Sequence, residues 1–413
     1  MQQLLYFRSS KSILTRLKQE DTGLPTMTHP SQPAANSDEV EAKFFAMPDI
    51  DAETMQDFME SLTEALQAVE RDLLLLEREP DNEEVINSLF RALHNVKGSC
   101  KMCLLDPLSD YSHSIEELLS VVRAKQLKLT PLLKEALLIA LDFLKLRAEF
   151  MQKNGRLETE QLFTIAKHFD RMQSMPAGEA EIEAATIIKL IGGAPLDGIP
   201  FVQHQHCAID KPYSAYLKIE AELEDIEFFK TLSLRIDKKS PFWENRTKSI
   251  LQFCMAANNH LEHPIDPQQL ATAAYLHDIG MVFVSSNLIN KHSKLTPYEE
   301  QEIQLHAQLG YQLLTRMSGW EDAARIIYQH HERPDGNGYP QGLKGDQICR
   351  GAKLIAVADT YFSITNIRAD RTNKRSMMRA ITEINAYVGT QFDEEVVIAF
   401  NKMMKESYTR TAP

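Results

Sequence analysis

The sequence predicts an all-α protein in which a four-helix bundle, an irregular connector and a second helical domain follow one another. Apolar residues recur at spacings of three and four over long segments, which is the period of a helix with one buried face. Proline next to Asp, Asn or Thr stands where several of these segments begin, as is typical of helix starts. Helical patterning resumes near Tyr213 and continues, with loops, to about Glu406.

The first helix is expected from Asp51 to about Arg78. Its apolar positions are Phe58, Leu62, Leu66, Val69, Leu73 and Leu76. Pro80-Asp81-Asn82 interrupts this pattern, and the Asn82 side chain can cap the next helix. Three further helices are expected over residues 82–103, 106–125 and 130–150. Because the connections are short, we expect the four helices to alternate in direction as an up-down bundle.

The connector differs in composition from the bundle. A further helix is expected at 157–173, whereas residues 174–212 carry several prolines and glycines and predict irregular structure with one short strand around Ile187–Ile191. The group His204-x-His206-Cys207 has metal-binding residue types. It has no second pair of ligands nearby, so it is interpreted as a surface loop.

Bulk properties restrict the class of protein. A chain of 413 residues is too long for one core, so two or three domains are expected. The net charge of −13 disfavours binding to a nucleic acid polymer or an anionic membrane surface. No stretch of 18 uncharged apolar residues occurs, so no membrane span is expected. Five cysteines, an odd number, favour a reducing cytoplasm. Residues 1–47 are expected to be a disordered tail and linker, with Met27 as a candidate start.

The first candidate site is His94, which is expected in the middle of the second helix. Lys97 lies one turn later and can attract phosphoryl oxygens on the imidazole, while Gly98 removes bulk where a partner would approach. The alternative is a surface histidine beside a helix irregularity. Cys100-x-x-Cys103 follows, and without a second pair of ligands or a βαβ context it is interpreted as two small buried residues.

Residues 48–152 resemble the histidine-containing phosphotransfer (HPt) domain, whose motif is His-x-x-Lys-Gly-Ser on the second helix of a four-helix bundle. The resemblance implies that His94 accepts a phosphoryl group from a receiver-domain aspartate, with Lys97 assisting. The implied partner is the receiver domain of a response regulator or hybrid kinase. Cys103 stands where HPt domains often have glycine, a change expected to alter packing rather than chemistry.

The second candidate site combines imidazoles and carboxylates on segments that are predicted to be mostly helical. Its residues are His277, Asp278, His306, His330, His331 and Asp359. A carboxylate can bridge two cations, and neighbouring imidazoles can reach one cation from different angles. Taken singly, each histidine is more often structural, but two adjacent doublets plus two further residues favour a metal site. Two cations can activate a shared water and hold a phosphate, which indicates phosphoester hydrolysis.

Residues 228–405 resemble the HD-GYP domain, a helical member of the HD phosphohydrolases that hydrolyses cyclic di-GMP. The motifs are His-Asp-Ile-Gly, a later histidine, His-His-Glu-Arg-Pro-Asp-Gly-Asn-Gly-Tyr-Pro, and Val-Ala-Asp. The resemblance implies that the six residues above bind two divalent cations, iron or manganese, with zinc as the alternative. It also implies a substrate-facing turn and basic positions that hold the phosphates: Gly338, Tyr339, Pro340, Arg368 and Arg371.

Three positions depart from this family. It usually has a His-x-x-Arg helix whose histidine is a further ligand, and here Arg246 is preceded by Trp243. A glutamate found in trinuclear members is Lys239, and the lysine of His-Asp-x-Gly-Lys is Met281. A third metal is therefore not expected. The departures also leave open a catalytically impaired domain that acts as a nucleotide- or partner-binding output module.

Together the two resemblances predict a cytoplasmic bacterial two-component signalling protein that couples phosphotransfer at His94 to metal-dependent hydrolysis of cyclic di-GMP to pGpG and GMP. The expected domains are 48–152 and 228–405, with a connector carrying extra helices at 153–227. A diguanylate cyclase domain is a further candidate partner. Hydrolysis of a different cyclic dinucleotide is the third possibility.

Overall fold

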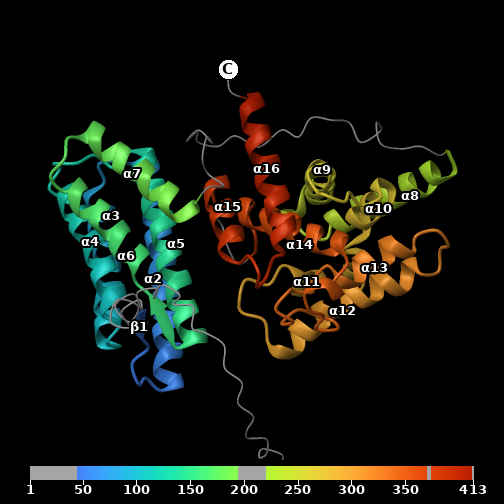
Figure 1. Ribbon diagram of the computed structural model, residues 1–413, viewed down its shortest axis with the longest axis horizontal. Coiled ribbons are helices and arrows are strands. Elements are labelled where there is room, and N and C mark those ends of the chain that lie inside the picture. The colour runs from blue at the N-terminus through green and yellow to red at the C-terminus, as the bar shows by residue number, and fades with distance from the viewer. Residues whose placement is uncertain (1–43, 194–219, 370–373, 412–413) are drawn as a thin grey trace, which may run out of the picture. The chain divides into compact units, whose positions relative to one another are not determined.

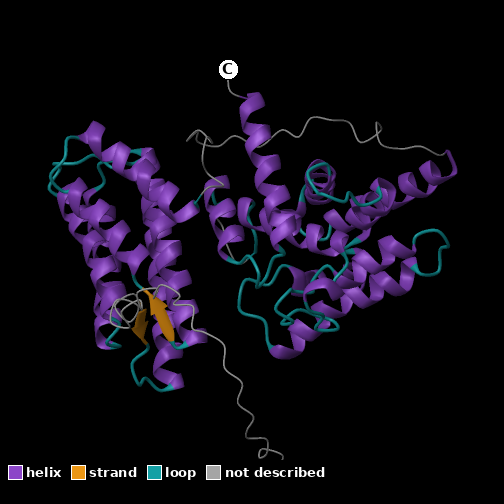
Figure 2. Cartoon of the chain, viewed as in Figure 1, coloured by secondary structure: helices purple, strands orange, loops and turns teal. Residues whose placement is uncertain are grey.

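The computed structural model describes residues 44–193, 220–369 and 374–411. These residues are mainly helical and contain one two-stranded antiparallel sheet, which confirms the all-α class (Figure 2). Residues 1–43, the His204–Cys207 group and Arg371 lie outside the described residues. Within the described part of the chain no helix is both long enough and apolar enough to cross a bilayer.

Four helices follow one another as the sequence predicts: α2 (Ala52–Arg78), α3 (Glu83–Met102), α4 (Asp106–Arg123) and α5 (Pro131–Asn154). Polar side chains cap the helix starts. Asp51 accepts a hydrogen bond from the backbone N–H of Thr54, and Asn82 accepts from the second and third residues of α3. These bonds satisfy amide groups that have no partner inside the helix.

The expected tail is partly wrong, because its last residues form strand β1 (Phe44–Ala46). β1 pairs with β2 (Arg156–Glu158) in antiparallel register, and Phe44 lies opposite Glu158. The Arg156 guanidinium also lies over the Phe44 ring, 5.1 Å from its centroid. A partner strand more than 100 residues away supplies this order, so the local composition could not predict it.

The expected strand at Ile187–Ile191 is wrong, because these residues belong to helix α7 (Ala177–Gly192). Ala184, Ile187 and Ile188 are buried at spacings of three and four, which is a helical stripe rather than strand alternation. Gly193, with φ of 64°, ends the helix. Helix α6 (Glu160–Met172) packs against α4, and α7 packs against α5, so both helices extend the bundle.

The remaining described residues form a second group of helices (Figure 1). In chain order these are α8 (Glu220–Asp237), η3 (Pro241–Trp243), α9 (Arg246–Asn258), α10 (Pro267–Leu276), η4 (Ile279–Phe283), α11 (Ser286–Ile289), α12 (Pro297–Leu314), α13 (Glu321–Gln329), η5 (Gly345–Gln347), α14 (Arg350–Thr365), α15 (Met377–Ala386) and α16 (Glu394–Thr411). Helices α9, α10, α13 and α14 pack against one another. Of the candidate metal ligands, His277 and Asp278 follow α10, His330 and His331 follow α13, Asp359 lies within α14, and His306 lies within α12.

Candidate metal centre and phosphoacceptor site

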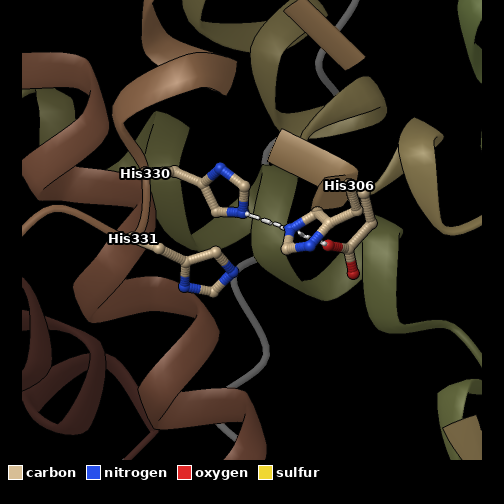
Figure 3. Close-up of side chains that lie close together, drawn as sticks. His306, His330 and His331 are labelled. Atoms are coloured by element: carbon tan, nitrogen blue, oxygen red, sulfur yellow. Dashed lines mark hydrogen bonds and ion pairs between the residues drawn. The ribbon is translucent and has the colours of Figure 1, made fainter. Parts of the chain in front are cut away.

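Four of the six predicted ligands come together in the structure. Asp278 lies between α10 and η4, His306 lies within α12, and His330 and His331 follow α13. One potential ligand atom from each lies within 4.8 Å of the others. Figure 3 shows the imidazoles of His306, His330 and His331 gathered around a shared space. Such a group of three imidazoles and one carboxylate fits one divalent transition-metal ion.

Backbone carbonyls orient the imidazoles. Nδ1 of His306 lies 2.6 Å from the Ile303 carbonyl oxygen, and Nδ1 of His330 lies 2.6 Å from that of Ile327. A carbonyl only accepts hydrogen bonds, so each Nδ1 carries the proton and donates it. The lone pair is therefore left on Nε2, and the two Nε2 atoms are 3.3 Å apart. This arrangement fixes the tautomer that a metal requires.

Burial and charge set the protonation of the cluster. Burial lowers the pKa of His306, and it lowers the pKa of His330 and His331 well below the usual value. Burial alone would raise the pKa of Asp278, but the Arg246 guanidinium and the surrounding histidines hold it well below its usual range. Neutral imidazoles beside an ionised carboxylate are the protonation states of metal ligands.

Gly280 brings two ligand-bearing segments into backbone contact. A Cβ at this position would lie 2.1 Å from the carbonyl oxygen of His306 and 2.6 Å from its Cα. Only glycine therefore allows η4 to approach α12 at the level of His306.

The predicted Gly338-Tyr339-Pro340 turn lies beside this cluster. The Tyr339 ring stacks on the His331 imidazole with centroids 4.7 Å apart. A Cβ at Gly338 would lie 2.4 Å from the backbone nitrogen of Arg333, so the turn requires glycine at this position. The buried Glu332 carboxylate accepts the backbone N–H groups of Gln341 and Leu343 at 2.6 and 2.9 Å, which holds the turn. Burial raises the pKa of Tyr339, so its phenol stays protonated.

The other two predicted ligands, His277 and Asp359, lie outside the four-residue group. Arg246 connects Asp359 to the site, because its guanidinium donates to Asp278 and, at 2.7 Å, to Asp359. Nε2 of His277 is buried, lies 3.6 Å from Oδ2 of Asp278, and has no hydrogen-bond partner among the described residues. The sequence motifs did not indicate that Arg246 would join the two carboxylates.

Arg368, a predicted phosphate contact, and Lys239, a departure from the family, both donate hydrogen bonds within the protein. The Arg368 guanidinium donates to the Ser363 hydroxyl at 3.2 Å. The Lys239 ammonium donates to the carbonyls of Met281, Val282 and Val284, so it binds the backbone at the end of η4.

The phosphoacceptor candidate His94 lies in α3, and 61% of its side chain is exposed. Its Nδ1 lies 2.7 Å from Oε1 of Glu116 in α4, and the Lys97 ammonium pairs with the same carboxylate. Burial alone would raise the pKa of Glu116, but Lys97 and His94 lower it below its usual value. An ionised Glu116 accepts a hydrogen bond from the Nδ1–H group of His94. The lone pair of the imidazole is then on Nε2, which is the nucleophilic nitrogen. Glu116 is 22 residues from His94 and outside the motif, so no sequence pattern indicates this contact.

Two family models match the chain, one in each half. Residues 53–148 match the Hpt domain, and residues 230–396 match the HD domain. The chain joins an Hpt domain to an HD domain. The HD domain implies a divalent cation, and the donor group around Asp278 fits one.

Curated relatives resemble part of the chain. A cyclic di-GMP phosphodiesterase of Thermotoga maritima is 35% identical over 140 residues, which are 33% of this chain and 38% of that protein. A 3'3'-cGAMP-specific phosphodiesterase of Vibrio cholerae is 30% identical over 181 residues, 42% of this chain and 39% of that protein. The cyclic di-GMP phosphodiesterase response regulator RpfG of Xanthomonas campestris is 35% identical over 129 residues, 31% of this chain and 34% of that protein. The chain therefore spans between a third and two fifths of these relatives.

Proposed function

We propose that the HD domain hydrolyses cyclic di-GMP to the linear dinucleotide pGpG and then to GMP, with iron or manganese bound, or zinc as the alternative. The observation that carries this proposal is the buried group of Asp278, His306, His330 and His331 beside the Tyr339 turn. The printed activities of the relatives support a cyclic dinucleotide as substrate.

A bound divalent cation supplies an activated water and neutralises charge on the phosphate. The protein's own residues prepare the site for this reaction. The Nδ1 bonds of His306 and His330 keep both Nε2 lone pairs directed into the site, and Glu332 holds the turn that carries Tyr339. In the hydrolysis, the water oxygen forms a bond to phosphorus, the bond from phosphorus to a ribose 3′ oxygen breaks, and that oxygen takes up a proton.

The Hpt domain is the regulatory half of this proposal. Nε2 of His94 forms a bond to phosphorus as the bond from phosphorus to the carboxylate oxygen of a receiver-domain aspartate breaks, and Glu116 holds Lys97 beside His94. A Cβ at Gly98 would meet no atom within 4 Å, so packing in this chain does not require the glycine, and a docking partner is one reason for it. The phosphate donor is a response regulator or hybrid kinase, and the protein acts in the bacterial cytoplasm.

Turnover by the full chain tests the enzymatic part. Protein purified without oxygen and loaded with iron or manganese should convert cyclic di-GMP to pGpG, which chromatography of the products detects. His330→Ala should lose both the metal and the activity, because His330 is a central donor of the group. 3'3'-cGAMP serves as the comparison substrate.

Two outcomes would contradict the proposal. Metal-loaded protein that leaves both dinucleotides intact would favour the impaired domain acting as a binding module. Faster hydrolysis of 3'3'-cGAMP than of cyclic di-GMP would keep the chemistry and replace the substrate.

A further inference from the structure

The positive charge between Asp278 and Asp359 comes from the protein itself. We infer that the Arg246 guanidinium takes the place of a second cation, so that this HD domain binds one divalent ion rather than two. This inference rests on the metal centre of the proposed function and specifies its composition. The number of ions bound can be measured without any assay of turnover.

Arg246 is built into the site. It is the first residue of α9, and only 7% of it is exposed. One terminal nitrogen donates to Oδ2 of Asp278, and the other donates to Oδ1 of Asp359 at 2.7 Å. These carboxylates come from segments that are far apart in the sequence, and one planar guanidinium joins them. A second cation shared by the same two carboxylates would have to displace this group.

The two oxygens of Asp278 already serve two different positive groups. Oδ1 lies 3.4 Å from Nε2 of His306 and 4.0 Å from Nε2 of His330, so it faces the four-residue metal group. Oδ2 faces Arg246. A carboxylate that bridges two cations uses one oxygen for each, and here the guanidinium occupies one of the two positions.

The side of the site next to Arg246 offers few ligands. The Arg246 guanidinium lies 5.0 Å from the centre of the Trp243 ring. Trp243 in turn packs on a small apolar cluster made by Met281, Val284 and Leu288. Two of the three departures from the HD-GYP motifs, Trp243 and Met281, therefore meet in one apolar surface, where a histidine and a lysine were expected. Indole and thioether groups are poor partners for a hard divalent cation, whereas an indole ring attracts a guanidinium.

His277 alone does not restore the second position. Its Nε2 lies 3.6 Å from the Asp278 oxygen that Arg246 binds. Because Arg246 binds Asp278 and Asp359, His277 is the one predicted ligand left at the second metal position. A single imidazole binds a divalent ion weakly.

The charge balance also favours one ion. Two carboxylates, one guanidinium and neutral imidazoles carry one net negative charge, and a divalent ion converts this to one positive charge. A phosphodiester, with one negative charge, then neutralises the site. A second divalent ion added while Arg246 stays in place would leave three positive charges in a buried space before substrate binds, which is costly in a low dielectric.

Counting bound ions tests the inference. Metal-free protein is titrated with Mn²⁺, and bound manganese is measured by elemental analysis, with electron paramagnetic resonance reporting whether two ions are coupled. We expect one ion per chain and the spectrum of an isolated ion. Two ions per chain with a coupled spectrum would overturn the inference.

Two buried histidines form a matched pair of variants. His277→Ala should still bind one ion per chain, whereas His330→Ala should lose it. A drop from two ions to one in His277→Ala would show that a second position exists. Trp243→His should leave the count at one, because Arg246 still binds both Asp278 and Asp359. Two ions per chain in Trp243→His, with folding verified by circular dichroism, would overturn the inference, since Trp243 rather than Arg246 would then limit the number of ions.

The turnover experiment separates this inference from the proposed function. One bound ion without hydrolysis would contradict the proposed function and leave the inference standing. Two bound ions with hydrolysis would contradict the inference alone.

Discussion

At the scale of single residues, Glu116 decides which nitrogen of His94 is available for reaction. Its carboxylate is buried, with 3% of the side chain exposed, while the imidazole that it contacts is mostly exposed. The same carboxylate holds the Lys97 ammonium. In the proposed phosphotransfer, Glu116 is therefore a positioning residue that acts through His94 and Lys97.

We predict that Glu116→Ala slows phosphorylation of His94 by a phosphorylated receiver domain roughly tenfold, the scale of one lost hydrogen bond to a charged group. Glu116→Gln should recover part of the rate, because an amide oxygen still accepts the Nδ1 proton. Nitrogen NMR should show both imidazole tautomers in the Ala variant and mainly the Nδ1-protonated one in wild type. His94→Gln, which should incorporate no phosphate, is the control. A Glu116→Ala variant with the wild-type rate of phosphorylation and the wild-type tautomer of His94 would contradict this role of Glu116.

Local motifs predicted candidate residues from their identity and spacing, such as His94 and the His330-His331 pair, and the structure places the pair beside Asp278 and His306. They could not predict Glu116, Glu332 or the contacts of Arg246, because these depend on segments that meet only after folding. An acidic residue on an amphipathic helix has no local mark of burial. Arg371 stays a prediction, because it lies outside the described residues.

At the scale of elements, the approach of η4 to α12 sets the spacing of the metal ligands. Asp278 directly precedes η4 and His306 lies within α12. Gly280 is the point at which the two segments touch. A side chain there has no flexible neighbour that can move aside, since the atoms in its way belong to the His306 backbone.

We predict that Gly280→Ala lowers the free energy of unfolding by about 1–3 kcal/mol, the usual cost of overpacking, and weakens metal binding by moving His306 away from Asp278. Chemical denaturation and a Mn²⁺ titration measure the two effects. Gly98→Ala is the matched control, because its Cβ meets nothing within 4 Å inside a helix and should stabilise the protein by up to about 1 kcal/mol. Equal effects of the two substitutions would contradict this account.

Helix starts were predictable because capping side chains lie next to the helices that they cap. Asp51, Asn82 and Thr130 all accept the expected backbone hydrogen bonds. The segment around Ile187–Ile191 was mistaken for a strand because a short β-branched run has no distinct period when read alone. Its helical character becomes visible only with Ala180 and Ala184, which extend the buried stripe.

At the scale of the whole molecule, Arg379 links the two domains, which belong to one compact unit. It lies on α15 of the HD domain and is 4% exposed. Its guanidinium donates to Glu70 of α2 at 2.5 Å and to Asp142 of α5 at 2.7 Å. The nearby Glu135 is half-buried, and its desolvation raises the pKa of its carboxyl. Removing the arginine would leave these acidic groups without their main counter-charge.

We predict that Arg379→Met destabilises the protein by about 3–5 kcal/mol, the cost of leaving buried charge unpaired, and splits one calorimetric transition into two. It should also abolish any effect of His94 phosphorylation on hydrolysis. Lys294→Ala is the control: its ion pair with Glu60 also joins the two domains, but 87% of the lysine side chain is exposed. That substitution should leave the stability almost unchanged, because solvent screens an exposed ion pair. A single, unshifted transition in Arg379→Met would contradict the link.

The contact between Gly280 and the His306 carbonyl has a consequence for how this protein can vary over time. At Gly280 the two segments meet through main-chain atoms, so this contact does not depend on the identity of the side chains in the surrounding core. A substitution in that core leaves this contact in place, whereas any side chain at position 280 removes it. A substitution of Gly280 should therefore be tolerated much less than a substitution of a neighbouring buried residue. Variants at position 280 should be far rarer among descendants of this protein than variants of those neighbours.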